Sequence, residues 1–83
     1  MTTFDIIKKH IDAWDPMELL ATGAPKDEYD VESRMIEERF FSGITTKELA
    51  RILAKVFSAQ FSESFSIADC LNTAEQIYNE HNV

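Results

Sequence analysis

The chain is short of the residues that break helices and of those that cross-link chains. Its 83 residues include two glycines, two prolines and one cysteine. So few glycines and prolines leave few turns, which favours a small number of helices over many short strands. The single Cys70 excludes an internal disulfide and is typical of a protein in a reducing compartment.

Long apolar runs and positive charge are also scarce. The first residues, MTTFDIIKKHID, hold no apolar stretch long enough for a signal peptide, and no segment could span a bilayer. Together with the single cysteine, this predicts a cytoplasmic protein without a membrane partner. Eight basic residues stand against fifteen acidic ones, a formal net charge of −7. Such a charge repels nucleic acids, so a nucleic-acid partner is not expected.

Apolar residues recur at helical spacing through most of the chain. The pattern predicts a single all-α domain, residues 1–83, built as a small bundle or orthogonal array of about four to five helices. Three of these helices are long, a short one follows Trp14, and another is C-terminal. No internal repeat is visible.

Side chains that can cap a helix are Thr2 or Thr3, Asp15, Thr45 and Ser66. Asp27 or Asp30 is expected to open the helix that runs through residues 31–41. Pro16 suits the first position of the short helix, which must end within two turns because Gly23 follows. The helix that begins near Asp30 is expected to run to Gly43. The spacings Thr45-x-x-Glu48 and Ser66-x-x-Asp69 place an acidic side chain three residues after each cap.

The segment WDPMELLATGAPKDEYD, residues 14–30, is the most unusual part of the chain. Trp14 continues the apolar stripe of the first helix, so we interpret it as a buried core anchor rather than a residue that stacks on a ligand. We expect the Asp15 side chain to cap the short helix, and the Tyr29 hydroxyl to bond a polar neighbour nearby. The segment is thus interpreted as a structural corner that involves Trp14, Asp15, Pro16, Asp27, Tyr29 and Asp30.

The same segment resembles a known family. Its WDP, LL, GAP and DEYD elements are similar to those of the YugE-like family, small helical bacterial proteins described as a domain of unknown function. The residues that carry the resemblance are Trp14, Asp15, Pro16, Leu19, Leu20, Gly23, Ala24, Pro25, Asp27, Glu28, Tyr29 and Asp30. The resemblance implies an all-helical fold and supplies no activity.

Patterns of catalytic, phosphate-binding or metal-binding residues are missing from the sequence. His10 and His81 stand outside any ligand spacing, and Cys70 lies in an apolar stripe, as a small buried residue does. Residues 27–32 lack the alternating acids and the glycine of a calcium loop, and acidic side chains at a helix start explain them. We therefore expect no enzyme, no cofactor and no metal site, with weak divalent-cation binding by residues 27–32 as an alternative.

A compact acidic chain without these motifs fits a protein that acts by docking. It could be an immunity-type inhibitor, a regulator or a subunit, and its partner an unknown protein or a second copy. The alternative is a nucleic-acid-binding regulator whose contact face is formed by Lys47, Arg51 and Lys55. We expect these cations instead to form weak surface pairs with residues 37–38 and Glu63.

Residues 29–40 carry two apolar stripes. One is expected to face the core. The other consists of Val31 and Met35, and the charged Glu32 and Arg39 separate it from the first. Either the short MELL segment folds over Val31 and Met35, or these two residues form a candidate partner face for a second chain.

Overall fold

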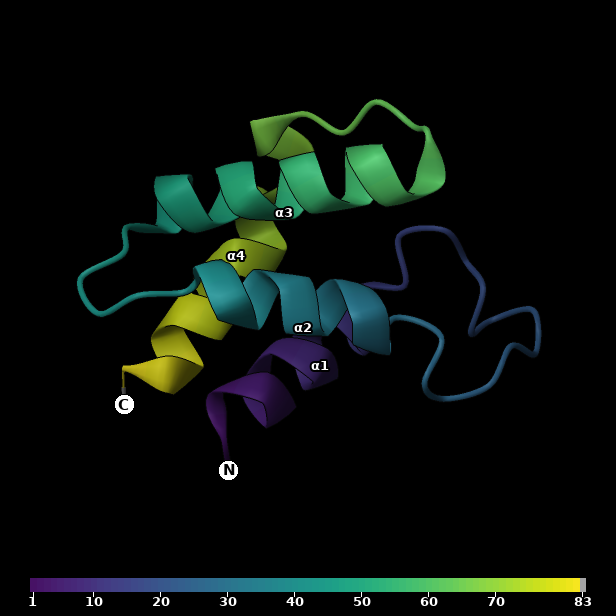
Figure 1. The fold of residues 1–83 in the computed structure, drawn as a ribbon, viewed down its shortest axis with the longest axis horizontal. Coiled ribbons are helices and arrows are strands. Elements are labelled where there is room, and N and C mark those ends of the chain that lie inside the picture. Colours follow the sequence, from purple (N-terminus) through teal and green to yellow (C-terminus); the bar gives the residue numbers. More distant parts are fainter. Residues whose placement is uncertain (83) are drawn as a thin grey trace.

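The structure is a computed structural model that describes residues 1–82 as four helices joined by turns (Figure 1). Helix α1 spans Thr3–Trp14, α2 spans Asp30–Arg39, α3 spans Thr46–Phe61 and α4 spans Ile67–His81. The predicted all-α fold is confirmed. None of the described helices is long and apolar enough to cross a membrane.

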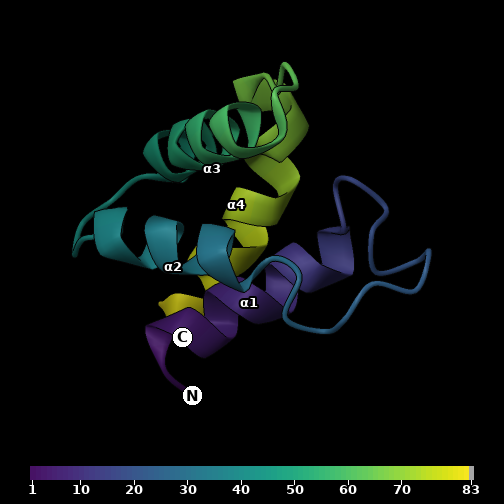
Figure 2. The same ribbon diagram turned by 45° about the vertical axis from the view of Figure 1, so that its right-hand side comes forward.

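The four helices make a closed ring of contacts. Helix α1 packs on α2 and α4, and α3 packs on the same two helices. In Figure 1, α3 lies across the top, α4 passes behind α2, and α1 lies below. The link between α1 and α2 projects to one side in both views, whereas the two chain ends lie close together (Figure 2).

Every helix buries one face in a common core. The core residues are Ile6, Ile7, Ile11, Tyr29, Ile36, Ile44, Leu49, Ala50, Leu53, Ala54, Val56, Phe57, Cys70, Ala74 and Ile77. Phe57 is fully buried, and the rings of Trp14 and Tyr29 meet it edge-on at centroid distances of 5.4 and 5.9 Å. Burying such a ring stabilises the fold by about 1.5–3 kcal/mol. Phe57 therefore joins α3 to α1 and to the α1–α2 link.

Three of the predicted caps are present. Thr2, Thr45 and Ser66 each accept a hydrogen bond from the backbone N–H three residues later, and the acidic side chain at that position accepts one in return. Helix α2 is different, because its cap is Tyr29 and no side chain caps it. The prediction that Asp27 or Asp30 opens this helix is confirmed for Asp30, which is its first residue.

The predicted short helix after Asp15 is absent, and residues 16–23 form hydrogen-bonded turns. Asp15 and Glu18 adopt left-handed backbone angles, with φ of 46° and 55°, which interrupt any right-handed helix. The N–H of Thr22 donates to the Glu18 carbonyl at 3.2 Å, which closes one turn only. Gly23, at φ 100°, then reverses the chain.

Helix α2 ends at Arg39, earlier than the predicted end at Gly43. Phe40 is extended, with φ −75° and ψ 135°, so the helix cannot continue through it. Gly43 has a φ of 91° and belongs to the turn that follows. The early end of α2 leaves residues 40–45 as a link that wraps toward α3.

Candidate functional site

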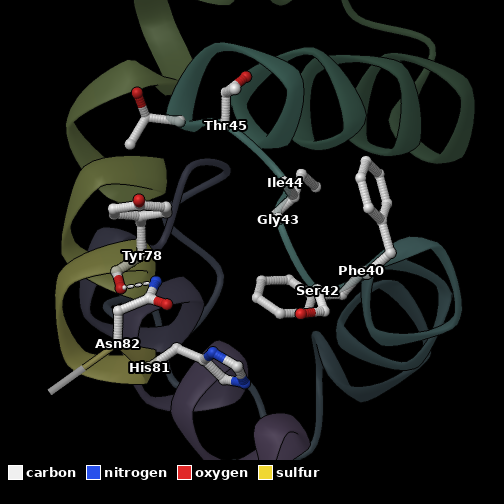
Figure 3. A pocket seen from close by; sticks show the side chains of 10 residues that line it. Phe40, Ser42, Gly43, Ile44, Thr45, Tyr78, His81 and Asn82 are labelled. Atoms are coloured by element: carbon white, nitrogen blue, oxygen red, sulfur yellow. Dashed lines mark hydrogen bonds between the residues drawn. The ribbon is translucent and has the colours of Figure 1, made fainter.

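A pocket of about 320 Å³ lies between the α2–α3 link and the C-terminal end of α4. One wall comes from residues 40–46, and the other comes from Tyr78, His81 and Asn82. Figure 3 shows the link and the last turns of α4 facing each other across the opening. These two walls are about 35 residues apart in sequence, so only the folded chain forms the pocket.

The link has its shape because one residue anchors it and one glycine turns it. Ile44 is buried, and its N–H donates to the Phe41 carbonyl at 3.2 Å. Gly43 supplies the left-handed backbone that this turn requires. As a result Phe40 turns inward against the core, whereas Phe41 keeps 49% of its surface exposed at the pocket.

The α4 wall is held in place from α1. The Nε2 atom of His81 lies 3.3 Å from Oγ1 of Thr3, and the His81 ring tilts against Phe40 at a centroid distance of 4.6 Å. Glu80 accepts hydrogen bonds at 2.8 Å from Lys9 and from His10. The pocket wall therefore does not need to be assembled when a ligand arrives.

The lining combines aromatic and apolar side chains with a nearly equal share of polar groups. Hydroxyl groups come from Ser42, Thr45, Thr46 and Tyr78, and an amide comes from Asn82. Among residues 1–82, no Asp, Glu, Lys or Arg side chain lines the pocket, although the chain has a net charge of −7. Such a lining suits an uncharged, apolar group that makes one or two hydrogen bonds.

The α1–α2 link lies on the opposite side of the molecule from the α2–α3 link (Figure 1), and in it Asp15 and Tyr29 of the predicted corner come together. Oδ1 of Asp15 accepts from the Tyr29 hydroxyl at 2.6 Å and from the Leu20 N–H at 3.1 Å, and its Oδ2 accepts from the Ala21 N–H at 2.9 Å. The Tyr29 hydroxyl in turn accepts from the Met17 N–H at 3.2 Å. The predicted hydrogen bond of Tyr29 is thus present, and Asp15 caps a single turn rather than a helix.

These contacts shift two pKa values in opposite directions. Burial, with a contribution from the Asp15 carboxylate, raises the pKa of Tyr29 to about 12. Burial alone would raise the pKa of Asp15, but the hydrogen bonds from Tyr29 and the turn N–H groups outweigh it and lower that pKa. Both shifts favour the state in which Tyr29 donates to an ionised Asp15.

Trp14 is partly exposed and packs against the core, in line with the expectation that it is largely buried. Its ring meets Phe57 and Phe65 edge-on, with a centroid distance of 6.0 Å to Phe65. Its outer side lines a wider and more open hollow, together with Met17 and Glu18. The hollow also carries Pro16, Glu63, Ser64, Phe65 and Asp69.

The acidic residues near the corner do not converge. Asp27 and Glu28 are exposed, whereas Asp30 pairs with Lys8 at 2.6 Å. Within residues 1–82, no three His, Cys, Asp or Glu side chains are grouped so that they could hold a metal ion. The acidic side chains of residues 27–32 are therefore not arranged to bind a divalent cation, the alternative considered for this segment.

Of the two alternatives for Val31 and Met35, the cover by the MELL segment is wrong, and the partner face stays a prediction. Val31 is 61% exposed, so the MELL segment does not cover it, whereas Met35 is half-buried against the core. Glu32, taken as a divider between two faces, is itself buried, and its Oε2 accepts from Gln60 Nε2 at 3.1 Å. The two residues therefore do not form one continuous covered stripe.

The cations of α3 also differ from expectation. Lys47, Arg51 and Lys55 are exposed, and in the described part of the chain none of them has a carboxylate within 4.0 Å. Among the described residues the expected pairs with residues 37–38 and Glu63 are absent, and Glu37 instead pairs with Arg34 of its own helix at 3.2 Å. This basic face is solvated and unpaired.

Residues 6–80 match the model of a family described as a domain of unknown function, DUF1871. The chain belongs to this family. Neither the comparison with curated proteins nor that with solved structures found a match. The matched range includes the whole corner and all of the pocket lining except His81 and Asn82.

Sequence reasoning missed the pocket. Its signals were weak: two adjacent aromatic residues, Phe40 and Phe41, followed by Gly43, and a Tyr78–His81 spacing near the chain end. The prediction placed His81 in the last turn of its helix, which is where it lies. Nothing in the sequence pattern indicated that its ring would meet Phe40.

Proposed function

We propose that this member of the family is a non-enzymatic docking protein, and that the pocket between residues 40–46 and the end of α4 receives an apolar side chain of a partner protein. The observation that carries the proposal is the lining of the pocket. Aromatic and aliphatic side chains share the cavity wall with neutral polar groups, and no Asp, Glu, Lys or Arg is among the described lining residues. Buried aromatic anchors of this kind dominate the affinity of protein interfaces.

The size of the pocket suits a small group, such as a side chain of a partner. Its volume of about 320 Å³ is at the low end of the range of about 300–1,000 Å³ for ligand pockets. The walls are fixed by Ile44 on the link and by the contacts of His81 and Glu80 with α1. A preformed pocket loses little free energy on ordering, which favours binding of a short segment.

The polar groups of the lining do not form a catalytic pair. His81 Nε2 lies 3.3 Å from Oγ1 of Thr3, which is not a lining residue, and makes no hydrogen bond to a lining hydroxyl. Nucleophilic catalysis needs a nucleophile and a base within hydrogen-bond reach of each other. The arrangement is better suited to holding a group than to reacting with it.

The resemblance to the YugE-like family and the DUF1871 membership both leave the partner open. A cytoplasmic location and a bacterial source remain predictions from the sequence. An unknown protein is the partner that the pocket suits, and a second copy of the chain is the alternative. The immunity-type and regulatory roles differ in the partner, not in the docking chemistry.

A selection of displayed random peptides on the immobilised protein tests the proposal. We expect enriched peptides to share one apolar residue, and Phe41→Ser to abolish the enrichment because it removes an exposed wall of the pocket. Val31→Ser is the matched control, since Val31 is an exposed apolar residue that does not line the pocket. Enrichment of the same peptides by Phe41→Ser, or no enrichment by the wild type, would contradict the proposed function.

A further inference from the structure

The three cations of α3 are arranged as a stripe. Lys47, Arg51 and Lys55 follow one another at intervals of four residues, so they lie along one side of the helix. Within the described residues none is paired, whereas Lys8, Lys9 and Arg34 each bind a carboxylate. The exposed Glu48 lies beside these cations, but its carboxylate accepts from the Thr45 N–H at 3.0 Å at the helix start. Three positive charges therefore stand against one negative charge on this side of α3. We call these three cations the α3 basic stripe.

The α3 basic stripe begins where the pocket ends. Thr46 lines the pocket, and Lys47 is the next residue. At 1.5 Å of rise per residue, neighbouring cations lie about 6 Å apart, and the stripe runs about 12 Å away from the pocket. An extended peptide advances about 6.6 Å for every two residues. The cations therefore match alternate positions of an extended chain.

We infer that the partner segment is acidic as well as apolar: an apolar residue occupies the pocket, and carboxylates at alternate positions beside it contact the α3 basic stripe. The inference rests on the proposed function, because the apolar residue sits in the same pocket. Its recognition is selective for a physical reason. The net charge of −7 repels an acidic segment from most of the surface, whereas the stripe attracts it and fixes its direction.

A short acidic protein segment suits this stripe better than nucleic acid does. Three cations over about 12 Å neutralise few phosphates, whereas proteins that bind DNA strongly make about six to ten phosphate contacts. The overall negative charge also repels a long polyanion at every other point of its length. A short segment with about three carboxylates can contact the α3 basic stripe without this long-range electrostatic repulsion.

The test measures the affinity of defined labelled peptides by fluorescence anisotropy. The main probe is an acetylated leucine followed by three serine–glutamate pairs. A second probe has the same composition with its three glutamates contiguous, and a third is a short DNA duplex. The protein forms are the wild type, the triple variant Lys47→Glu/Arg51→Glu/Lys55→Glu, and Phe41→Ser. Lys26→Glu is the control, because Lys26 is an exposed cation outside the stripe.

We expect the triple variant to bind the main probe about tenfold more weakly, since each surface pair contributes about two- to fivefold. The affinity of Lys26→Glu for the main probe should stay within about twofold of that of the wild type. A higher salt concentration should weaken binding of this probe to the wild type, as the triple substitution does. The contiguous probe should bind more weakly than the alternating one. Thermal melting checks that the triple variant is folded, which is expected because Lys47, Arg51 and Lys55 are exposed.

Unchanged affinity of the triple variant overturns the inference, and the proposed function survives if Phe41→Ser still abolishes binding. If Phe41→Ser has no effect either, the proposed function fails as well. If the alternating and the contiguous peptide bind equally well, the claim that the cations match carboxylates at alternate peptide positions is wrong. Tighter binding of the duplex than of the main probe, lost in the triple variant, would make the stripe a nucleic-acid surface instead.

Discussion

Replacing Tyr29 by phenylalanine tests the corner with the smallest possible change. The Tyr29 ring is fully buried and would keep its contacts with Phe57 and Phe61. The substitution removes only the hydroxyl, which donates to Asp15 at 2.6 Å and accepts from the Met17 N–H at 3.2 Å. The link of residues 15–29 would then lose the side chain that ties both of its ends together.

The expected loss of unfolding free energy is about 1.5 kcal/mol. Hydrogen bonds to charged groups contribute about 1.5–3 kcal/mol, and the low end applies because the surroundings of Asp15 are half-exposed. For a domain of this size, the change corresponds to a fall in Tm of about 6–12 °C. Tyr78→Phe is the matched control, because the structure shows no hydrogen bond from the Tyr78 hydroxyl to the described residues.

Urea unfolding followed by circular dichroism measures the difference. A loss of unfolding free energy below about 0.5 kcal/mol, or one equal to that of Tyr78→Phe, would refute the claim that the Tyr29 hydroxyl stabilises the corner.

The pH dependence of stability gives a second check. The pKa of Asp15 is lowered in the folded state, so its contribution to stability is present above the ordinary carboxyl range and is lost as the pH falls through the lowered pKa. In Tyr29→Phe this acid-side loss should become smaller.

Four further predictions concern stability and reactivity. Trp14→Ala should lower the unfolding free energy by about 3 kcal/mol in urea, the low end for an aromatic because the ring is half-buried; near-wild-type stability would make Trp14 a surface residue. Met35→Glu should lower the unfolding free energy by about 1–3 kcal/mol, and Val31→Glu should lower it by less than about 0.5 kcal/mol. Equal losses would contradict the observation that Met35 is more buried than Val31. Millimolar Ca²⁺ or Mg²⁺ should leave Tm unchanged, and a saturable rise would reveal a cation site. Burial, with the charge of Asp69, raises the pKa of Cys70 to about 11, so its alkylation at pH 8 should be at least about tenfold slower than in urea; equal rates would show an accessible thiol.

The helix starts could be predicted because their signals are local. Each capping box needs two side chains three residues apart, and Thr2, Thr45 and Ser66 form such boxes. The pairing of Asp15 with Tyr29 was also predictable in outline, since both belong to one short segment. These are contacts that residues make with near neighbours in sequence.

Features that depend on distant residues could not be predicted. The burial of Glu32 requires Gln60, which lies 28 positions away and supplies the hydrogen bond that a helical wheel does not show. The short helix failed because Glu18 adopts a left-handed backbone without being glycine, a choice made by the hydrogen bonds of the folded link. The pocket required α4 to return beside residues 40–46, and no spacing in the sequence encodes that return.

Chemical-shift mapping of the isotope-labelled protein with N-acetyl-leucine amide tests the docking pocket most directly. The probe presents one apolar side chain and no charge, so it reports on the pocket without the α3 basic stripe. The account predicts saturable shifts concentrated at residues 40–46 and 78–82, and their loss in Phe41→Ser. Shifts that never saturate, or that concentrate instead at the hollow beside Trp14 and Met17, would contradict it.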